Sequence, residues 1–233
     1  MMRLLAANYT DRGSRDGINQ DSVLSLITEN LAIFCVADGM GGHRHGELAS
    51  REIVGSLRMW QQANRDRVFD KPLVLFDEIE EILSAVNKEI FHRYNAQGPC
   101  GSTLVCLVIS GDRYAVYSAG DSRLYKKKKL HMYQITRDDA AANGKLTKAV
   151  GVSENIKYNR SMGKLKKNDE FFLCTDGVYK ELNPATIKKL PGKVFFTGKN
   201  RGIEKLINSV QKQVSRKGAS DNHSAIFVKC VEK

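Results

Sequence analysis

Eight short runs of strand type recur along the 233-residue chain, and they constrain its fold more than any other feature. They cover residues 22–27, 31–37, 102–110, 113–119, 123–126, 130–136, 170–175 and 224–230. The pair Gly111-Asp112 separates two of these runs by a two-residue hairpin signal, which predicts antiparallel pairing between neighbours. The lysine-rich stretch "YKKKKLHMY" between two further runs is typical of a hairpin tip or a sheet edge.

Three segments carry the apolar spacing of helices. The clearest follows Lys71-Pro72, where apolar residues recur at steps of three and four: Phe76, Ile79, Leu83, Val86 and Ile90. Residues 46–64 and 201–214 repeat the pattern. We expect all three helices to cover sheet faces, which predicts an α+β fold of antiparallel sheets flanked by helices.

The chain reads as one domain, residues 1–233. It has no internal repeat, no low-complexity tract and only four prolines, and its 42% apolar residues suffice for a sizeable core. No apolar run approaches the ~20 residues of a membrane-spanning helix, and the start lacks the apolar segment of a signal peptide, so we expect a cytoplasmic protein without membrane contact. The five cysteines form no CxxC pair, which argues against a disulfide scaffold or a zinc site.

The net charge of +11 is unevenly distributed: residues 1–116 sum to −3 and residues 117–233 to +14. A solvated basic face explains this most simply, although the same charge suits acidic or phosphorylated protein partners. A nucleic-acid binder is a further hypothesis that only the charge supports, because base-stacking motifs and zinc-finger spacing are absent from the sequence.

Five aspartates mark the ends of five strand-like runs: Asp21, Asp38, Asp121, Asp176 and Asp221. If those ends meet at one edge of the sheets, the crowded carboxylates need protons or cations to neutralise them. Oxygen ligands without a histidine pair or cysteine cluster favour Mg²⁺ or Mn²⁺. Gly39 and Gly177 would let the backbone turn closely around an ion. A single Asp-Gly pair is most simply an ordinary turn, but five such acids together favour a site.

Eight segments in chain order resemble the motifs of the protein phosphatase 2C family of metal-dependent phosphatases, in its bacterial form. They are "GSRDGINQDS", "VADGMGGHRHGELAS", "GSTLVCLV", "SAGDSRLY", "ITRDD", "LTKAVG", "LCTDGVYKEL" and "SDNHSAIFV", and the resemblance covers residues 5–230. It implies a four-layer α-β-β-α sandwich, a monomer, and hydrolysis of phosphoserine and phosphothreonine in proteins that a cognate Ser/Thr kinase phosphorylates.

The resemblance also implies the roles of the site residues. Asp38 would bridge two Mn²⁺ or Mg²⁺ ions, the Gly39 carbonyl would bind one, Asp176 and Asp221 would hold the other, and Asp21 would bind through water. The remaining roles are a weak third metal at Asp121, a phosphate clamp at Arg15, with Arg12 in reserve, and a general acid at His43 or His45. A surface location explains either histidine equally well.

This carry-over agrees with simple chemistry, because water shared by two divalent ions is acidic enough to attack phosphorus without a nucleophilic side chain. The alternative is a degenerate relative that binds phosphoproteins without hydrolysing them. The sequence departs from the family pattern in four places. Asp16 stands where the family usually has the arginine, with Arg15 one residue further back, and Asp139 stands where histidine is common. The flap is shortened to residues 139–145, and Lys180 stands where relatives carry an acid. With Lys180 there, we expect a third ion to bind weakly or not at all.

Overall fold

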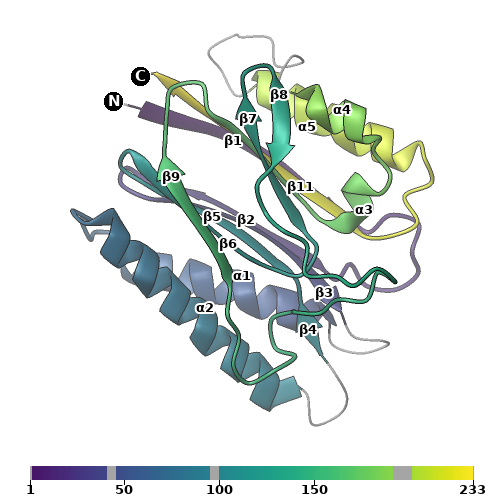
Figure 1. The fold of residues 1–233 in the computed structure, drawn as a ribbon, viewed down its shortest axis with the longest axis horizontal. Helices are drawn as coiled ribbons and strands as arrows, with labels where there is room; N and C mark the ends of the chain where they lie inside the picture. The colour runs from purple at the N-terminus through teal and green to yellow at the C-terminus, as the bar shows by residue number, and fades with distance from the viewer. Residues whose placement is uncertain (1, 41–45, 95–99, 191–200, 233) are drawn as a thin grey trace.

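The computed structural model describes residues 2–40, 46–94, 100–190 and 201–232, and within these ranges the strands form two sheets (Figure 1). The first has the order β1 (Met2–Asp11), β11 (His223–Glu232), β10 (Glu170–Cys174), β7 (Arg123–Lys128) and β8 (His131–Gln134). The second has the order β2 (Asp21–Ile27), β3 (Ala32–Met40), β5 (Leu104–Ser110), β6 (Arg113–Ala119) and β9 (Asn159–Lys164), with β4 (Gly101–Ser102) paired to β3. Every one of these pairings is antiparallel, as predicted.

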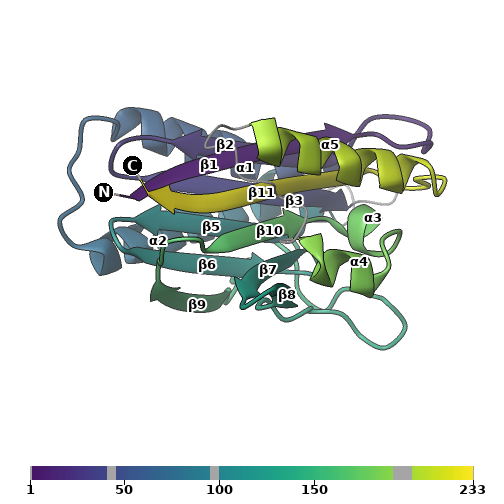
Figure 2. The same ribbon diagram turned by 90° about the horizontal axis from the view of Figure 1, so that it is seen from above.

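Helices cover the outer face of each sheet. The second sheet is covered by α1 (Gly46–Ala63) and α2 (Pro72–Tyr94), and the first by α4 (Pro184–Lys188) and α5 (Arg201–Ser215). The single-turn helix α3 (Asp176–Tyr179) directly follows β10. Figure 1 shows the two sheets between these two sets of helices, and Figure 2 looks down on the same stack from above. The predicted four-layer α-β-β-α sandwich is therefore confirmed.

The alternation of side chains along the strands builds this layering. In β10, Phe171 and Leu173 belong to the core between the two sheets, whereas Phe172 and Cys174 pack toward α5. A third core lies between the second sheet and helices α1 and α2. Since a fully buried side chain of this size contributes ~1.5–3 kcal/mol, these residues hold the layers together and fix the strand ends relative to one another.

The eight predicted strand runs and the three predicted helices are all present, with ends shifted by a few residues. Two strands escaped prediction. The edge strand β9 reads "NRSMGK" and has no buried residue, so it shows no apolar alternation. The alanines and asparagine of β1 disguise the pattern of that strand. The hairpin at Gly111, where φ is 58°, follows the prediction.

The five cysteines are all buried, and none forms a disulfide. This agrees with the absence of a disulfide scaffold expected from their spacing. Within the described ranges, no helix has both the length and the apolar character needed to cross a bilayer.

Candidate functional site

The predicted aspartates come together where the two sheets end. Asp21 opens β2 directly opposite Asp38 near the end of β3, so the antiparallel register alone makes them neighbours. Asp176 begins α3 after β10, and Asp221 precedes the neighbouring strand β11. The loops that carry these two residues touch, since a Cβ on Gly177 would lie 2.1 Å from the Asn222 carbonyl oxygen.

The electrostatics of the site confirm this proximity. Burial raises the pKa of Asp38 well above its usual range, and the charges of Asp21, Asp176 and Asp221 raise it further. Burial also raises the pKa of Asp21 to about 7, against the hydrogen bond from Thr175. The four carboxyl groups therefore act on one another as a cluster that demands protons or cations.

The oxygens of these carboxylates differ in what holds them. One oxygen of each of three acids has a protein donor: Thr175 Oγ1 donates to Asp21 Oδ2 at 2.9 Å, Lys180 Nζ to Asp176 Oδ2 at 2.5 Å, and Arg15 to Asp221 Oδ1 at 2.7 Å. Asp21 Oδ1 and Asp176 Oδ1 are buried without a hydrogen-bond partner. Buried oxygens left unpaired are costly, and a hard divalent cation would satisfy them.

The residues present thus fit Mg²⁺ or Mn²⁺. In the described part of the chain, however, no three acidic, histidine or cysteine side chains are spaced as a formed metal-ligand group. The individual ligand roles given to these aspartates therefore stay predictions.

The backbone around Asp38 is held rigidly. The Asp38 N–H donates to Thr103 Oγ1 at 3.0 Å, and its carbonyl accepts from the Thr103 N–H at 2.8 Å. Gly39 donates to the Gln20 carbonyl at 3.0 Å, and a Cβ there would lie 2.1 Å from the Gly46 carbonyl oxygen. Only glycine permits this close crossing of β3 and the start of α1, which explains the glycine after Asp38.

The loop between β1 and β2 brings Arg15 to the cluster. This loop packs on the segment before β11: Gly13 has φ of 69°, and a Cβ there would lie 2.3 Å from the Asp221 carbonyl oxygen. Arg15, about half-exposed, pairs with Asp221, whereas the Arg12 guanidinium turns to the Gly17 carbonyl at 3.4 Å. Of the two predicted clamp residues, Arg15 is the one that lies beside a predicted metal ligand.

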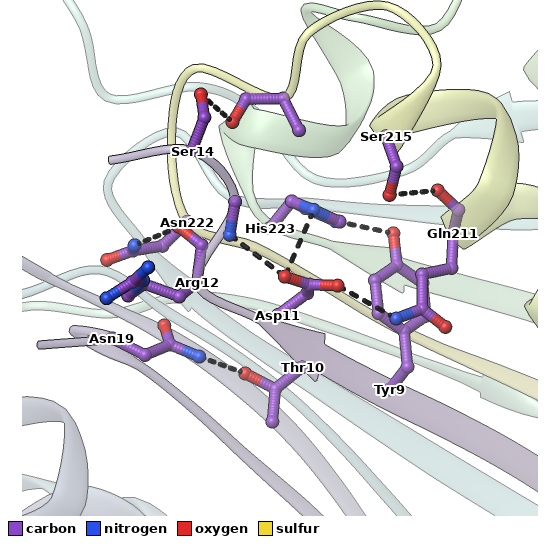
Figure 3. A network of polar contacts seen from close by, with 12 residues as sticks. Tyr9, Thr10, Asp11, Arg12, Ser14, Asn19, Gln211, Ser215, Asn222 and His223 are labelled. Atoms are coloured by element: carbon purple, nitrogen blue, oxygen red, sulfur yellow. Dashed lines mark hydrogen bonds and ion pairs between the residues drawn. The ribbon is translucent and has the colours of Figure 1, made fainter. Parts of the chain in front are cut away.

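A polar network that includes Asp11 and Asn222 holds the segment before β11 in place (Figure 3). The buried Asn222 side chain donates to the Arg12 carbonyl at 2.7 Å and accepts from the Gln20 N–H at 2.9 Å. Asp11 accepts from the Gly13 N–H and from Gln211 of α5, both at 2.9 Å (Figure 3). The network fixes both ends of the arginine loop against the start of β11.

Asp121 lies at the margin of the cluster. Burial and the charge of Asp176 raise its pKa, while the Tyr179 hydroxyl donates to its Oδ2 at 3.1 Å. The ring of Tyr179 is in turn held under the Arg123 guanidinium, 3.6 Å from the ring centroid. Asp121 is therefore held near Asp176 by the last residue of α3.

His43 and His45, the two candidates for the general acid, lie outside the described residues.

The departures from the family pattern that the structure describes have different outcomes. Asp139 has a structural role that the sequence did not reveal: it accepts from Asn159 at 2.8 Å and pairs with Lys148 at 3.1 Å. The short segment after it closes through hydrogen bonds between residues 141 and 145, which makes it a tight turn instead of an extended flap.

Two residues of the site were missed as contributors. Thr175 joins Asp21 to the Ser224 N–H, which donates to its hydroxyl at 3.0 Å, and Asn222 ties the arginine loop to Asp221. Each directly precedes or follows a predicted aspartate, in "CTDG" and "SDN", so adjacency to those acids was the available signal.

The family model for protein phosphatase 2C matches residues 10–214. The chain belongs to the protein phosphatase 2C family. This membership confirms the resemblance seen in the sequence. Seven of the eight segments lie within residues 10–214, and the eighth, at residues 220–228, follows them.

Curated relatives of this family member are bacterial. It is 27% identical over 197 residues to the serine/threonine phosphatase stp of Listeria monocytogenes, covering 72% of this chain and 75% of that protein. It is 26% identical over 200 residues to the serine/threonine protein phosphatase PstP of Mycobacterium tuberculosis, covering 78% of this chain. The match spans only 37% of PstP, which is a much longer protein.

Solved structures share the fold over nearly the whole chain. PppA, described as a key regulatory component of T6SS in Pseudomonas aeruginosa, has a TM-score of 0.82 and 27% identity, covering 97% of both chains. The catalytic domain of PstP, in complex with 2 manganese ions, also has a TM-score of 0.82, with 23% identity and full coverage of both chains. This second likeness supports the fold alone.

Proposed function

We propose that this member of the protein phosphatase 2C family is a metal-dependent protein serine/threonine phosphatase, with residues 1–233 as one catalytic domain. The observation that carries the proposal is the cluster of four carboxyl groups in which Asp21 Oδ1 and Asp176 Oδ1 are buried and unpaired. Family membership and the bacterial serine/threonine phosphatases among the relatives supply the reaction class.

In this proposal Asp38, Asp176, Asp221 and the Gly39 carbonyl hold two Mn²⁺ or Mg²⁺ ions, with Asp21 behind them. Such ions, when bound, neutralise charge on a phosphoryl group and acidify water at neutral pH. Thr175 orients Asp21 through its Oδ2 and leaves the buried Oδ1 without a protein donor. Arg15 clamps the phosphate, since one nitrogen of its guanidinium contacts Asp221 and the half-exposed remainder can offer paired donors to phosphate oxygens.

The substrates in this proposal are proteins that carry phosphoserine or phosphothreonine. The short turn at residues 141–145 leaves the site open to them. A cognate Ser/Thr kinase and a cytoplasmic location complete the proposal. The larger share of basic residues in the second half of the chain suits acidic phosphoprotein segments.

The test is release of phosphate from phosphoserine and phosphothreonine peptides with Mn²⁺, with and without a chelator. We expect activity only with metal, and a loss of at least about a thousandfold in Asp38→Asn and Asp176→Asn, because the ions would lose their central ligands. Asp112→Asn, an exposed carboxylate in the hairpin after β5, is the matched control and should keep full activity.

Activity that persists with chelator, or in Asp38→Asn, would exclude the mechanism. A protein that binds Mn²⁺ and phosphopeptides without turnover would instead support the degenerate alternative. Calorimetric titration with Mn²⁺ separates the two results from a failure to bind metal at all.

A further inference from the structure

Lys180 contacts the carboxylate cluster and has no task in the phosphatase proposal. It ends the single turn of α3, where its N–H donates to the Asp176 carbonyl at 2.9 Å. Its side chain returns along the same side of the turn, so that Nζ lies 2.5 Å from Asp176 Oδ2. The Lys180 side chain is 62% exposed and that of Asp176 only 13%, so a charge based at the surface reaches into the cluster.

The lysine side chain is positively charged at neutral pH, because the ordinary pKa of an ammonium group lies far above 7. Lys180 therefore places a positive charge against the Asp176 carboxylate.

Because of this contact, the two oxygens of the Asp176 carboxylate have different surroundings. Oδ2 is taken by Lys180, whereas Oδ1 is buried, has no hydrogen-bond partner, and is left for an ion. Tyr179, the residue before Lys180, holds Asp121 by donating its hydroxyl to Asp121 Oδ2 at 3.1 Å. A divalent ion shared by Asp176 Oδ2 and Asp121 would have to displace the ammonium or lie against it, and like charges repel strongly at that range.

We propose that Lys180 is a positioning residue that acts as a built-in counter-ion: it orients Asp176 through Oδ2 and prevents an additional divalent ion from binding between Asp176 and Asp121. The inference rests on the proposed metal centre. It makes the number of bound ions a property of one side chain, limiting the cluster to two.

The test counts Mn²⁺ bound at millimolar concentration, by the electron paramagnetic resonance signal of free Mn²⁺ in a titration. We expect two ions for the unaltered protein and for Lys180→Arg, which keeps the charge. In Lys180→Glu an additional ion should bind, with an affinity about tenfold or more above any further binding in the unaltered protein. Lys188→Gln, which changes an exposed lysine of α4, is the matched control and should bind two ions.

The double variant Lys180→Glu with Asp121→Asn should return to two ions, because the new site would lose its second carboxylate. Identical counts and affinities in the unaltered protein, Lys180→Glu and Lys180→Gln would overturn the inference while leaving the phosphatase proposal intact. An unaltered protein that binds no Mn²⁺ would overturn both. Circular dichroism of each variant without metal verifies that the count compares folded proteins.

Discussion

At the scale of single residues, the site is built by contacts that only one side chain can satisfy. Gly39 is the clearest case, because its α-carbon faces the Gly46 carbonyl where β3 passes the start of α1. The same backbone also receives Asp38, whose N–H and carbonyl are both bonded to Thr103. A shift of the backbone at Gly39 would therefore also move Asp38.

We expect Gly39→Ala to lower the free energy of unfolding by about 1–3 kcal/mol and to weaken Mn²⁺ binding, because its Cβ would lie 2.1 Å from a backbone oxygen that cannot yield without moving α1. Denaturant unfolding measures the first effect and calorimetric titration the second. Gly55→Ala, within α1 and with nothing within 4 Å, should instead stabilise by about 0.5–1 kcal/mol. Equal effects of the two changes would contradict this account.

At the scale of elements, helix α2 holds a loop as well as covering a sheet. Its Asn87 side chain is fully buried, donates to the Ser153 and Glu154 carbonyls, both at 2.9 Å, and accepts from the Gly151 N–H at 2.7 Å. That loop continues from Val150, which pairs with Ser102 beside Asp38 and Gly39. The helix is thus connected to the candidate site through β4.

Replacing Asn87 by leucine should cost about 2–4 kcal/mol, because it keeps the volume but removes the side-chain bonds to three backbone groups, of which the Gly151 N–H is buried. In this variant, hydrogen exchange at residues 150–154 should speed up more, relative to the unaltered protein, than exchange elsewhere. Ser84→Ala on the same helix removes one local bond and should cost less than ~0.5 kcal/mol. A cost for Asn87→Leu as small as this control would show that the loop does not depend on the helix.

At the scale of the whole molecule, the carboxyl cluster links stability to pH and to metal. The pKa of Asp21 is raised to about 7 and that of Asp38 is raised well above its usual range, in both cases chiefly by burial. An acid whose pKa is higher in the folded state stabilises the fold below its unfolded pKa, near 4, and that stability is lost as pH rises through the folded value. Without metal, these groups therefore oppose folding at neutral pH.

The melting temperature of the protein in chelator should accordingly fall as pH rises from 5 to 8. Saturating Mn²⁺ should reverse or flatten this slope, because ions bind the deprotonated carboxylates and stabilise only the folded state. Scanning calorimetry across this range, with and without Mn²⁺, makes the comparison. In Asp38→Asn the slope in chelator should be shallower, and an unchanged slope would show that the cluster does not control it.

The sequence by itself determined the strand runs, the antiparallel pairing of neighbouring strands, the three long helices and the five aspartates at strand ends. Periodicity and residue type carry that information locally. The edge strand β9 and the weakly patterned strand β1 escaped, since neither shows a clear alternation. Only the tertiary structure decided which donor holds each carboxylate: Thr175 on Asp21, Lys180 on Asp176 and Arg15 on Asp221. Such contacts depend on where loops distant in the chain meet in space, and no local pattern records that distance.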